Sequence, residues 1–216
     1  MKAYRTIKEI DDKIETLYEI QKSKFITHLR HVDNEEEARA FVTAIKKRYY
    51  DARHNCSAYI LGEDSGRQLQ KSNDDGEPGG TAGAPILEAV KQNGLTDIVV
   101  VVTRYFGGIK LGAGGLIRAY SHAATLGLNA AVKLEMQPFQ EISITLDYSL
   151  QPAIEHWLRA NSIRTSETIY AETVTLPLLL PPDEVETRLK EITDLTAANF
   201  TQEKGRLLRL PIEIKT

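Results

Sequence analysis

Residues 72–85 combine carboxylates with glycines, a composition that suits a ligand site. Asp74, Asp75 and Glu77 stand there among four glycines. Carboxylates on a flexible loop can hold Mg²⁺ beside a phosphate, although a solvated surface loop has the same composition. Because 14 residues without secondary structure would be long for a compact domain, we expect a functional loop. We expect no bound cofactor, with Mg²⁺ at these carboxylates as the alternative.

A second candidate segment, residues 103–110, follows the β-branched run 98–102, which is typical of a buried strand. Ligands gather at strand ends in open α/β layouts. The guanidinium of Arg104 is a planar fork that suits a phosphate or carboxylate. Tyr105 could stack on a nucleic-acid base, and Lys110 adds a positive charge. The alternatives are a buried aromatic side chain and an Arg104 that pairs with a local carboxylate.

A third segment contains Gly112, Gly114 and Gly115 and is followed by Arg118. Glycines just before a helix leave backbone N–H groups unobstructed at the positive end of the helix dipole, which predicts an anion site. The segment is neither a dinucleotide-binding fingerprint, since Ile117 replaces the last glycine, nor a Walker A loop. A tight turn that lets the helix pack against the sheet is the alternative.

His54 and Cys56 stand two residues apart, so on a strand they would face the same side. Such a pair could form a nucleophile, although a buried, inert cysteine is the commoner outcome. No set of histidines has metal-ligand spacing, so we expect no metal site. If the protein is an enzyme, its catalytic candidates are His54, Asp74, Asp75 and Glu77.

Composition narrows the class of protein. The chain has 216 residues and a net charge of −3, without the basic excess of a protein that coats nucleic acid by charge alone. A single cysteine excludes a disulfide framework and a multi-cysteine zinc site. The longest stretch without charged residues, 119–132, is too short to span a bilayer. With no secretory signal at the start, we expect a cytoplasmic protein without a membrane partner.

Charge and glycine content indicate two domains, 1–135 and 136–216. Residues 1–135 carry a net charge of +1 and residues 136–216 a net charge of −4. Ten of the 14 glycines lie between positions 76 and 115. Apolar residues alternate or recur at helical spacing in the second half, which predicts the order β-α-β-β-α-β, a ferredoxin-like arrangement.

The first half also mixes strands and helices, so the predicted fold class is α+β. We expect extended segments at 4–7, 14–20 and 24–29, and a helix that begins after Asp33 or Asn34. Further along the chain we expect a strand at 56–61, a helix at 86–92, a strand at 98–102 and a helix after Gly115.

Three segments in this order, 53–59, 74–85 and 101–112, resemble the IMPACT/YigZ family, and the resemblance covers about residues 15–130. The second half is similar to the extra domain of the bacterial members. For the first half the resemblance implies a left-handed β-α-β fold, as in a small-subunit ribosomal protein, the fourth domain of elongation factor G and the protein part of ribonuclease P. For the second half it implies a likeness to the ferredoxin-like fifth domain of elongation factor G.

In function, the resemblance implies RNA or ribosome binding, or regulation of translation through a translation-related protein. The family has no settled catalytic activity. We expect the motif-bearing face of the first domain to bind phosphates, which gives the predicted nucleic-acid or anion-binding set: Arg53, Lys71, Arg104, Tyr105, Lys110, Gly112, Gly114, Gly115 and Arg118. A small enzyme that acts on a phosphorylated ligand and a purely protein-binding regulator are the alternatives.

Overall fold

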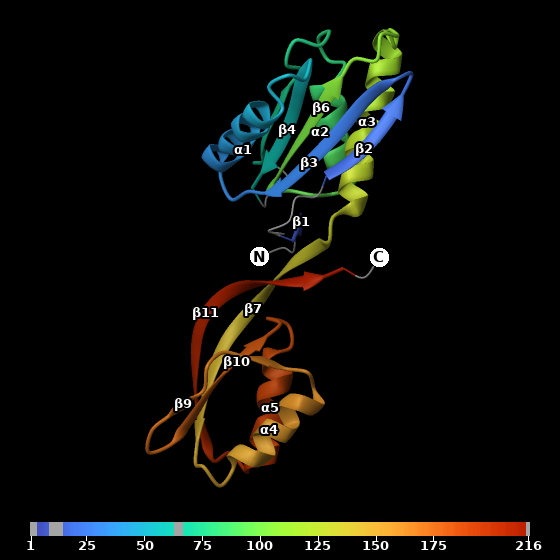
Figure 1. Ribbon diagram of the computed structural model, residues 1–216. Helices are drawn as coiled ribbons and strands as arrows, with labels where there is room; N and C mark the ends of the chain where they lie inside the picture. Colours follow the sequence, from blue (N-terminus) through green and yellow to red (C-terminus); the bar gives the residue numbers. More distant parts are fainter. Residues whose placement is uncertain (1–3, 9–14, 63–66, 215–216) are drawn as a thin grey trace. The chain divides into compact units, whose positions relative to one another are not determined.

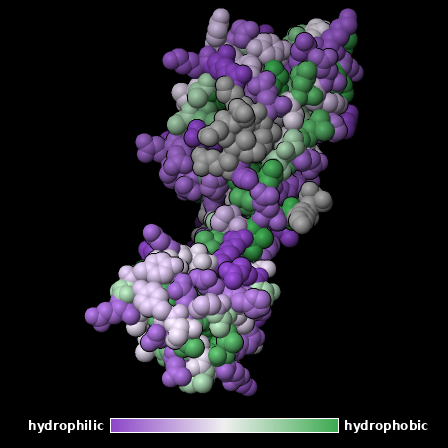
Figure 2. Space-filling view, turned by 60° about the horizontal axis from the view of Figure 1, so that its bottom comes forward, coloured by the Kyte–Doolittle hydropathy of each residue, from purple (hydrophilic) through white to green (hydrophobic). Residues whose placement is uncertain are grey.

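The computed structural model describes residues 4–8, 15–62 and 67–214 and has an α+β fold, as predicted (Figure 1). The chain divides into two compact units. Tyr4–Glu135, with Glu213 and the residue after it, forms the first, and Met136–Ile212 forms the second. Figure 2 shows mostly hydrophilic side chains on the surface of each unit, interspersed with smaller hydrophobic areas.

The first unit is built on a five-stranded sheet with the order β2-β3-β6-β4-β5. Every neighbouring pair is antiparallel. The strands are β2 (Glu15–Ile20), β3 (Ser23–His31), β4 (His54–Leu61), β5 (Leu69–Asn73) and β6 (Ile98–Tyr105). The central strand β6 pairs with β3 on one side and β4 on the other, so residues at its end meet residues from both neighbours. The short strand β1 (Tyr4–Ile7) is not part of this sheet.

Helices cover both faces of this sheet (Figure 1). Helices α2 (Gly83–Gln92) and α3 (Gly112–Ala130) form the larger core with one face, and α1 (Glu35–Arg48) packs on the other. Val100 and Val102 of β6 face the larger core, whereas Val99 faces α1. Since both faces of β6 are buried, apolar residues occupy consecutive positions and do not alternate with polar ones. The buried strand predicted from this run is confirmed.

Local capping explains where α1 begins. The Asn34 side chain accepts a hydrogen bond from the Glu37 backbone N–H at 2.9 Å, as an N-cap residue does. Three glutamates occupy the first turn and three cationic residues the last, which complements the helix dipole. The predicted cap is therefore correct.

Several features of this unit differ from the prediction. Strand β5 was not predicted, because it is an exposed, polar edge strand whose sequence has no hydrophobic alternation. Strand β4 begins at His54 rather than at 56, and β6 ends at Tyr105 rather than at 102. Helix α2 begins at Gly83 and α3 at Gly112, so the glycines lie in the first turns rather than before them. The order of the elements is otherwise as expected. No observation tests the left-handed β-α-β crossover, which stays a prediction.

The second unit follows the predicted order β-α-β-β-α-β, except that the first of the two middle strands is split into two short strands, β8 and β9. Its strands are β7 (Lys133–Leu146), β8 (Arg164–Thr165), β9 (Ile169–Tyr170), β10 (Val174–Leu180) and β11 (Phe200–Glu213), and its helices are α4 (Gln151–Ala160) and α5 (Val185–Thr196). The sheet order is β11-β7-β10-β8, with β9 also on β10. Alternate residues of β7 and β10 form the core with α4 and α5.

Two details of this sheet differ from what its sequence indicates. Alternating apolar residues predict the last strand only from Leu208, whereas β11 begins at Phe200; its first half is exposed and polar and is held by pairing with β7. Pro177 favours an edge strand or a bulge, but β10 has strands on both sides. Pro177 lies where β8 has ended and β9 has not yet begun, so its missing N–H breaks no pairing on that side.

Candidate functional site

A buried ion pair stands at the end of β6, where the sequence predicted an anion-binding arginine. The Arg104 Nη1 donates to Glu77 Oε1 at 2.6 Å, and the Tyr120 hydroxyl donates to the same oxygen at 2.8 Å. Arg104 is 5% exposed and Glu77 8%. The guanidinium lies between the rings of Phe25 and Phe106, at 5.4 and 5.7 Å from their centroids. Its charge is therefore neutralised inside the protein.

The pairing of Arg104 with a local carboxylate was the alternative to phosphate binding, and it is the arrangement observed. Arg104 is therefore not part of an exposed anion-binding surface. Its Nε is buried and has no hydrogen-bond partner among the described residues. A buried charge of this kind needs its partner, because removing one member leaves the other uncompensated.

Cys56 and His54 border the ion pair without forming a nucleophile. The Cys56 thiol donates to the Asp74 backbone oxygen and lies 3.3 Å from the Tyr120 hydroxyl. Burial raises the pKa of this thiol to about 12, so it is not a thiolate at neutral pH. The His54 Nδ1 is 2.8 Å from the Asp75 backbone oxygen, and its Nε2 is 3.8 Å from Glu77 Oε1.

The two aspartates of the glycine-rich loop hold the loop itself in place. Asp74 accepts hydrogen bonds from the backbone N–H groups of residues 80, 82 and 83 at 2.8–3.0 Å. Burial alone would raise the pKa of Asp74, but these three donors lower it below its usual value. Asp75 accepts from Lys46 and from the Asn55 backbone N–H. This loop is thus a structured bridge between β5 and α2.

These contacts bear on the alternative of a small enzyme. Both oxygens of Asp74 and of Asp75 take part in internal hydrogen bonds, and Glu77 faces Arg104. Across the described ranges, no three His, Cys, Asp or Glu side chains are grouped so that they could hold a metal ion. The loop therefore does not present the free carboxylates that Mg²⁺ beside a phosphate would need.

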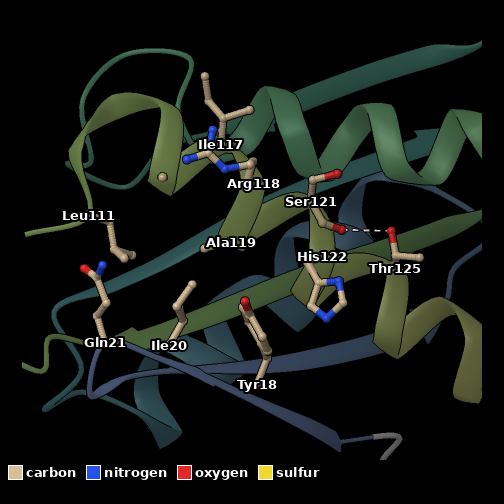
Figure 3. A pocket seen from close by; sticks show the side chains of 11 residues that line it. Tyr18, Ile20, Gln21, Leu111, Ile117, Arg118, Ala119, Ser121, His122 and Thr125 are labelled. Carbon is tan, nitrogen blue, oxygen red and sulfur yellow. Dashed lines mark hydrogen bonds between the residues drawn. The ribbon is translucent and has the colours of Figure 1, made fainter.

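An open hollow of about 580 Å³ lies beside the first half of α3 (Figure 3). Strand β2, at the edge of the sheet, forms one wall with Tyr18, and the other wall is α3 with Arg118 and His122. No aspartate or glutamate is among the described residues that line this hollow. These residues are Tyr18, Ile20, Gln21, Leu111, Gly115, Ile117, Arg118, Ala119, Ser121, His122 and Thr125.

Glycines bring the rim of this hollow together. A Cβ at Gly107 would overlap the backbone of Lys22, so only glycine lets the loop after β6 lie on the turn between β2 and β3. Gln21 and Lys22 form that turn with φ of 46° and 62°. The Arg118 guanidinium lies over the first turn of α3, where a Cβ at Gly114 would be 3.5 Å from its Nη1.

Arg118 lines this hollow, and two further cations, the predicted Lys110 and the unpredicted Lys22, are next in sequence to its lining residues Leu111 and Gln21. All three cations are exposed. None of the three makes an ion pair within the part of the chain that the structure describes. They are therefore available to an external anion. Gly112, Gly114 and Gly115 lie in the first turn of α3, where backbone N–H groups have no partner inside the helix.

The remaining predicted residues lie elsewhere in the unit. Lys71 is on β5 and pairs with Glu35 at 3.1 Å. The Tyr105 hydroxyl donates to Asp51 at 2.8 Å, and burial raises the pKa of this tyrosine to about 12. Arg53 is exposed in the turn before β4. Their predicted binding of nucleic acid stays a prediction.

The chain matches two known domain families. Residues 21–128 match the Impact N-terminal domain, and residues 144–199 match a domain of unknown function (DUF1949). YvyE, an IMPACT family member of Bacillus subtilis, is 42% identical over 208 residues, which is 96% of this chain and 94% of that protein. The chain belongs to the IMPACT family.

Two further comparisons cover both units. The family member YigZ of Escherichia coli is 35% identical over 195 residues, 90% of this chain and 92% of that protein. A solved structure of a hypothetical protein is 32% identical and covers 96% of this chain and 97% of its own, with a TM-score of 0.60. The resemblance seen in the sequence is confirmed, since the first domain match contains all three motifs.

In this IMPACT chain, sequence reasoning missed residues that complete the buried ion pair and the hollow. Tyr120, which contacts the ion pair, belongs to none of the three motifs, although a buried tyrosine needs a partner for its hydroxyl. Tyr18, Gln21 and His122 belong to no motif, because β2 and α3 meet only in the folded unit.

Among the described residues, none of the helices combines the length and apolar character needed to cross a membrane.

Proposed function

We propose that this IMPACT-family chain is a cytoplasmic regulatory protein that acts on translation by binding RNA or the ribosome. The family resemblance implies this class of function. The observation that carries the proposal for this chain is the group of exposed cations around the hollow beside α3: Lys22, Lys110 and Arg118. We call this group the cationic rim.

The cations of the cationic rim have no internal counter-charge among the described residues, unlike several other positive residues of the unit. Lys46 pairs with Asp75, and Lys71 and Arg39 both pair with Glu35. Cations that already hold a carboxylate gain little from a phosphate, because the first partner must be released. Unpaired lysine and arginine side chains instead exchange only water and small ions for the phosphate.

The low total charge of the chain favours local contact over general coating of nucleic acid. Three rim cations predict a slope of log K against log salt of about −2 on single strands, since each neutralised phosphate contributes about −0.7. Most such contacts position the nucleic acid and carry no sequence information. Recognition would then depend on shape, as on a folded RNA surface.

Filter binding of RNA to the full chain at low salt tests this proposal. The triple variant Lys22→Ala, Lys110→Ala, Arg118→Ala should lose at least ten-fold in affinity and flatten the salt dependence. The matched control replaces three other exposed cations of the same unit, Arg30, Lys47 and Lys91, by alanine.

Two results would overturn the proposal. One is an absence of RNA affinity in the unaltered chain at low salt. The other is an equal loss in the rim variant and the control variant, which would mean that only net charge matters. Circular dichroism of all three proteins verifies that the variants are folded.

A further inference from the structure

We infer that the hollow beside α3 takes one unpaired nucleotide of RNA, with its base against Tyr18 and His122 and its phosphate beside Arg118. This inference rests on the proposed function and specifies the ligand. It concerns single-stranded RNA, because only an unpaired base is free to leave the stack and enter a hollow.

The size and openness of the hollow suit one nucleotide. At about 580 Å³ it lies within the range of small-ligand sites in proteins. Its walls are a strand edge and a helix, and both are secured to the larger core of the unit. A double helix could touch only the rim, since its bases are held inside the stack.

Aromatic rings stand on both walls. The Tyr18 and His122 rings meet edge to face, with centroids 4.5 Å apart and an angle of 62° between the planes. Tyr18 is supported from behind by Phe25, at a centroid distance of 6.2 Å. His122 is exposed, so its ring is open to a ligand. Proteins that bind single-stranded RNA stack bases on tyrosine and histidine rings of this kind.

Polar groups are placed to hold the other parts of a nucleotide. Arg118 and His122 stand one helical turn apart on α3, and both line the hollow. Figure 3 shows the His122 ring directed towards Tyr18 and the Arg118 guanidinium directed towards the start of the helix. Gln21, in the turn after β2, also lines the hollow, and its side chain makes no hydrogen bond among the described residues. An amide carries both a donor and an acceptor, as the edge of a base does.

The chemistry of the lining favours a nucleotide over a basic ligand. The described lining residues include an arginine, a histidine and an amide but no carboxylate. A lysine-rich peptide would find no counter-charge there. An extended peptide with other side chains is the competing occupant, and the experiment includes it.

The experiment compares two RNA probes on the full chain: an unstructured single strand of about eight nucleotides, and a blunt duplex of the same length and composition. We expect the single strand to bind more tightly. The variant His122→Glu should weaken single-strand binding by on the order of ten-fold, the typical effect of losing one base–aromatic stack. Duplex binding should change by less than two-fold.

Asn129→Glu is the matched control, because it adds the same charge at an exposed position of α3 outside the hollow. Its single-strand affinity should equal that of the unaltered chain. Ser121→Phe is a second test, since it fills the hollow without adding charge. It should weaken single-strand binding as His122→Glu does.

The outcomes separate this inference from the proposed function. If neither probe binds at low salt, the proposed function fails and the inference fails with it. If RNA binds but the two probes bind equally, or His122→Glu matches Asn129→Glu, the inference alone is overturned. It is also overturned if the hollow variants abolish capture of a protein from nuclease-treated lysate while RNA binding is unchanged.

Discussion

Arg104 and Arg118 show how differently one fold can use two arginines. Arg104 stands shortly before a pair of glycines, and Arg118 stands shortly after a glycine-rich segment. In the sequence, each of them suggests an anion site. Arg104 is buried at the end of a central strand and holds Glu77 at 2.6 Å. Arg118 is exposed on α3 and makes no ion pair among the described residues.

The difference teaches that burial, and not residue type, decides which charge can serve a ligand. A guanidinium in the core must be neutralised by the protein itself, because water cannot solvate it there. A guanidinium at the surface keeps its charge available. We therefore expect the ion pair to govern stability and the cationic rim to govern binding, and the predictions below test that division.

The largest expected effect is on the ion pair. Arg104→Ala leaves the Glu77 carboxylate buried without its counter-charge, which should cost about 3–5 kcal/mol of unfolding free energy. Urea unfolding followed by circular dichroism measures the loss. Arg118→Ala serves as the control, and an equal cost in both variants would contradict the division.

Histidine protonation should give the next largest effect. His28 is 2% exposed, and burial lowers its pKa to about 4, with smaller opposing effects of Glu15 and Arg48. The unfolded chain binds the proton more readily, so stability should fall as the pH drops from about 6.5 towards 4, by up to about 3 kcal/mol. In the variant His28→Gln this part of the pH dependence should disappear, whereas His122→Gln should retain it. Unfolding free energies measured at several pH values would reveal either result.

Asp74→Asn should have an intermediate effect. The amide keeps one acceptor oxygen, but its NH₂ group faces backbone N–H donors at the start of α2. The expected cost is about 1–3 kcal/mol of unfolding free energy. Asp194→Asn, at an exposed position of α5, is the matched control and should change stability little. Equal urea midpoints for the two variants would show that the loop does not depend on Asp74.

The smallest effect on stability is expected at the rim. Arg118→Ala should change the unfolding free energy by less than about 0.5 kcal/mol, as surface substitutions usually do. The same variant should lower the magnitude of the salt slope of RNA binding by about 0.7. Stability and filter-binding measurements on one preparation make the contrast with Arg104 direct. A large loss of stability would show that Arg118 is part of the core.

Periodicity accounts for the parts of the fold that the sequence predicted correctly. The valines of β6 and the alternating residues of β7 and β10 follow from burial of one or both faces of a strand. Strand β5 and the first half of β11 escaped prediction because they are exposed and polar, so pairing with a neighbour, and not hydrophobic patterning, makes them strands.

By itself, the chain's sequence determined the α+β class, the order β-α-β-β-α-β of the second unit, the cap at Asn34 and the IMPACT motifs, because local propensity and short-range patterns encode all of these. Only the tertiary structure decided that Glu77 reaches Arg104, 27 positions along the chain, and that β2 and α3 enclose a hollow with no carboxylate among its described lining residues. Contacts between distant segments depend on how the sheet is ordered. Strand order is a property of the whole fold, and no short stretch of residues carries it.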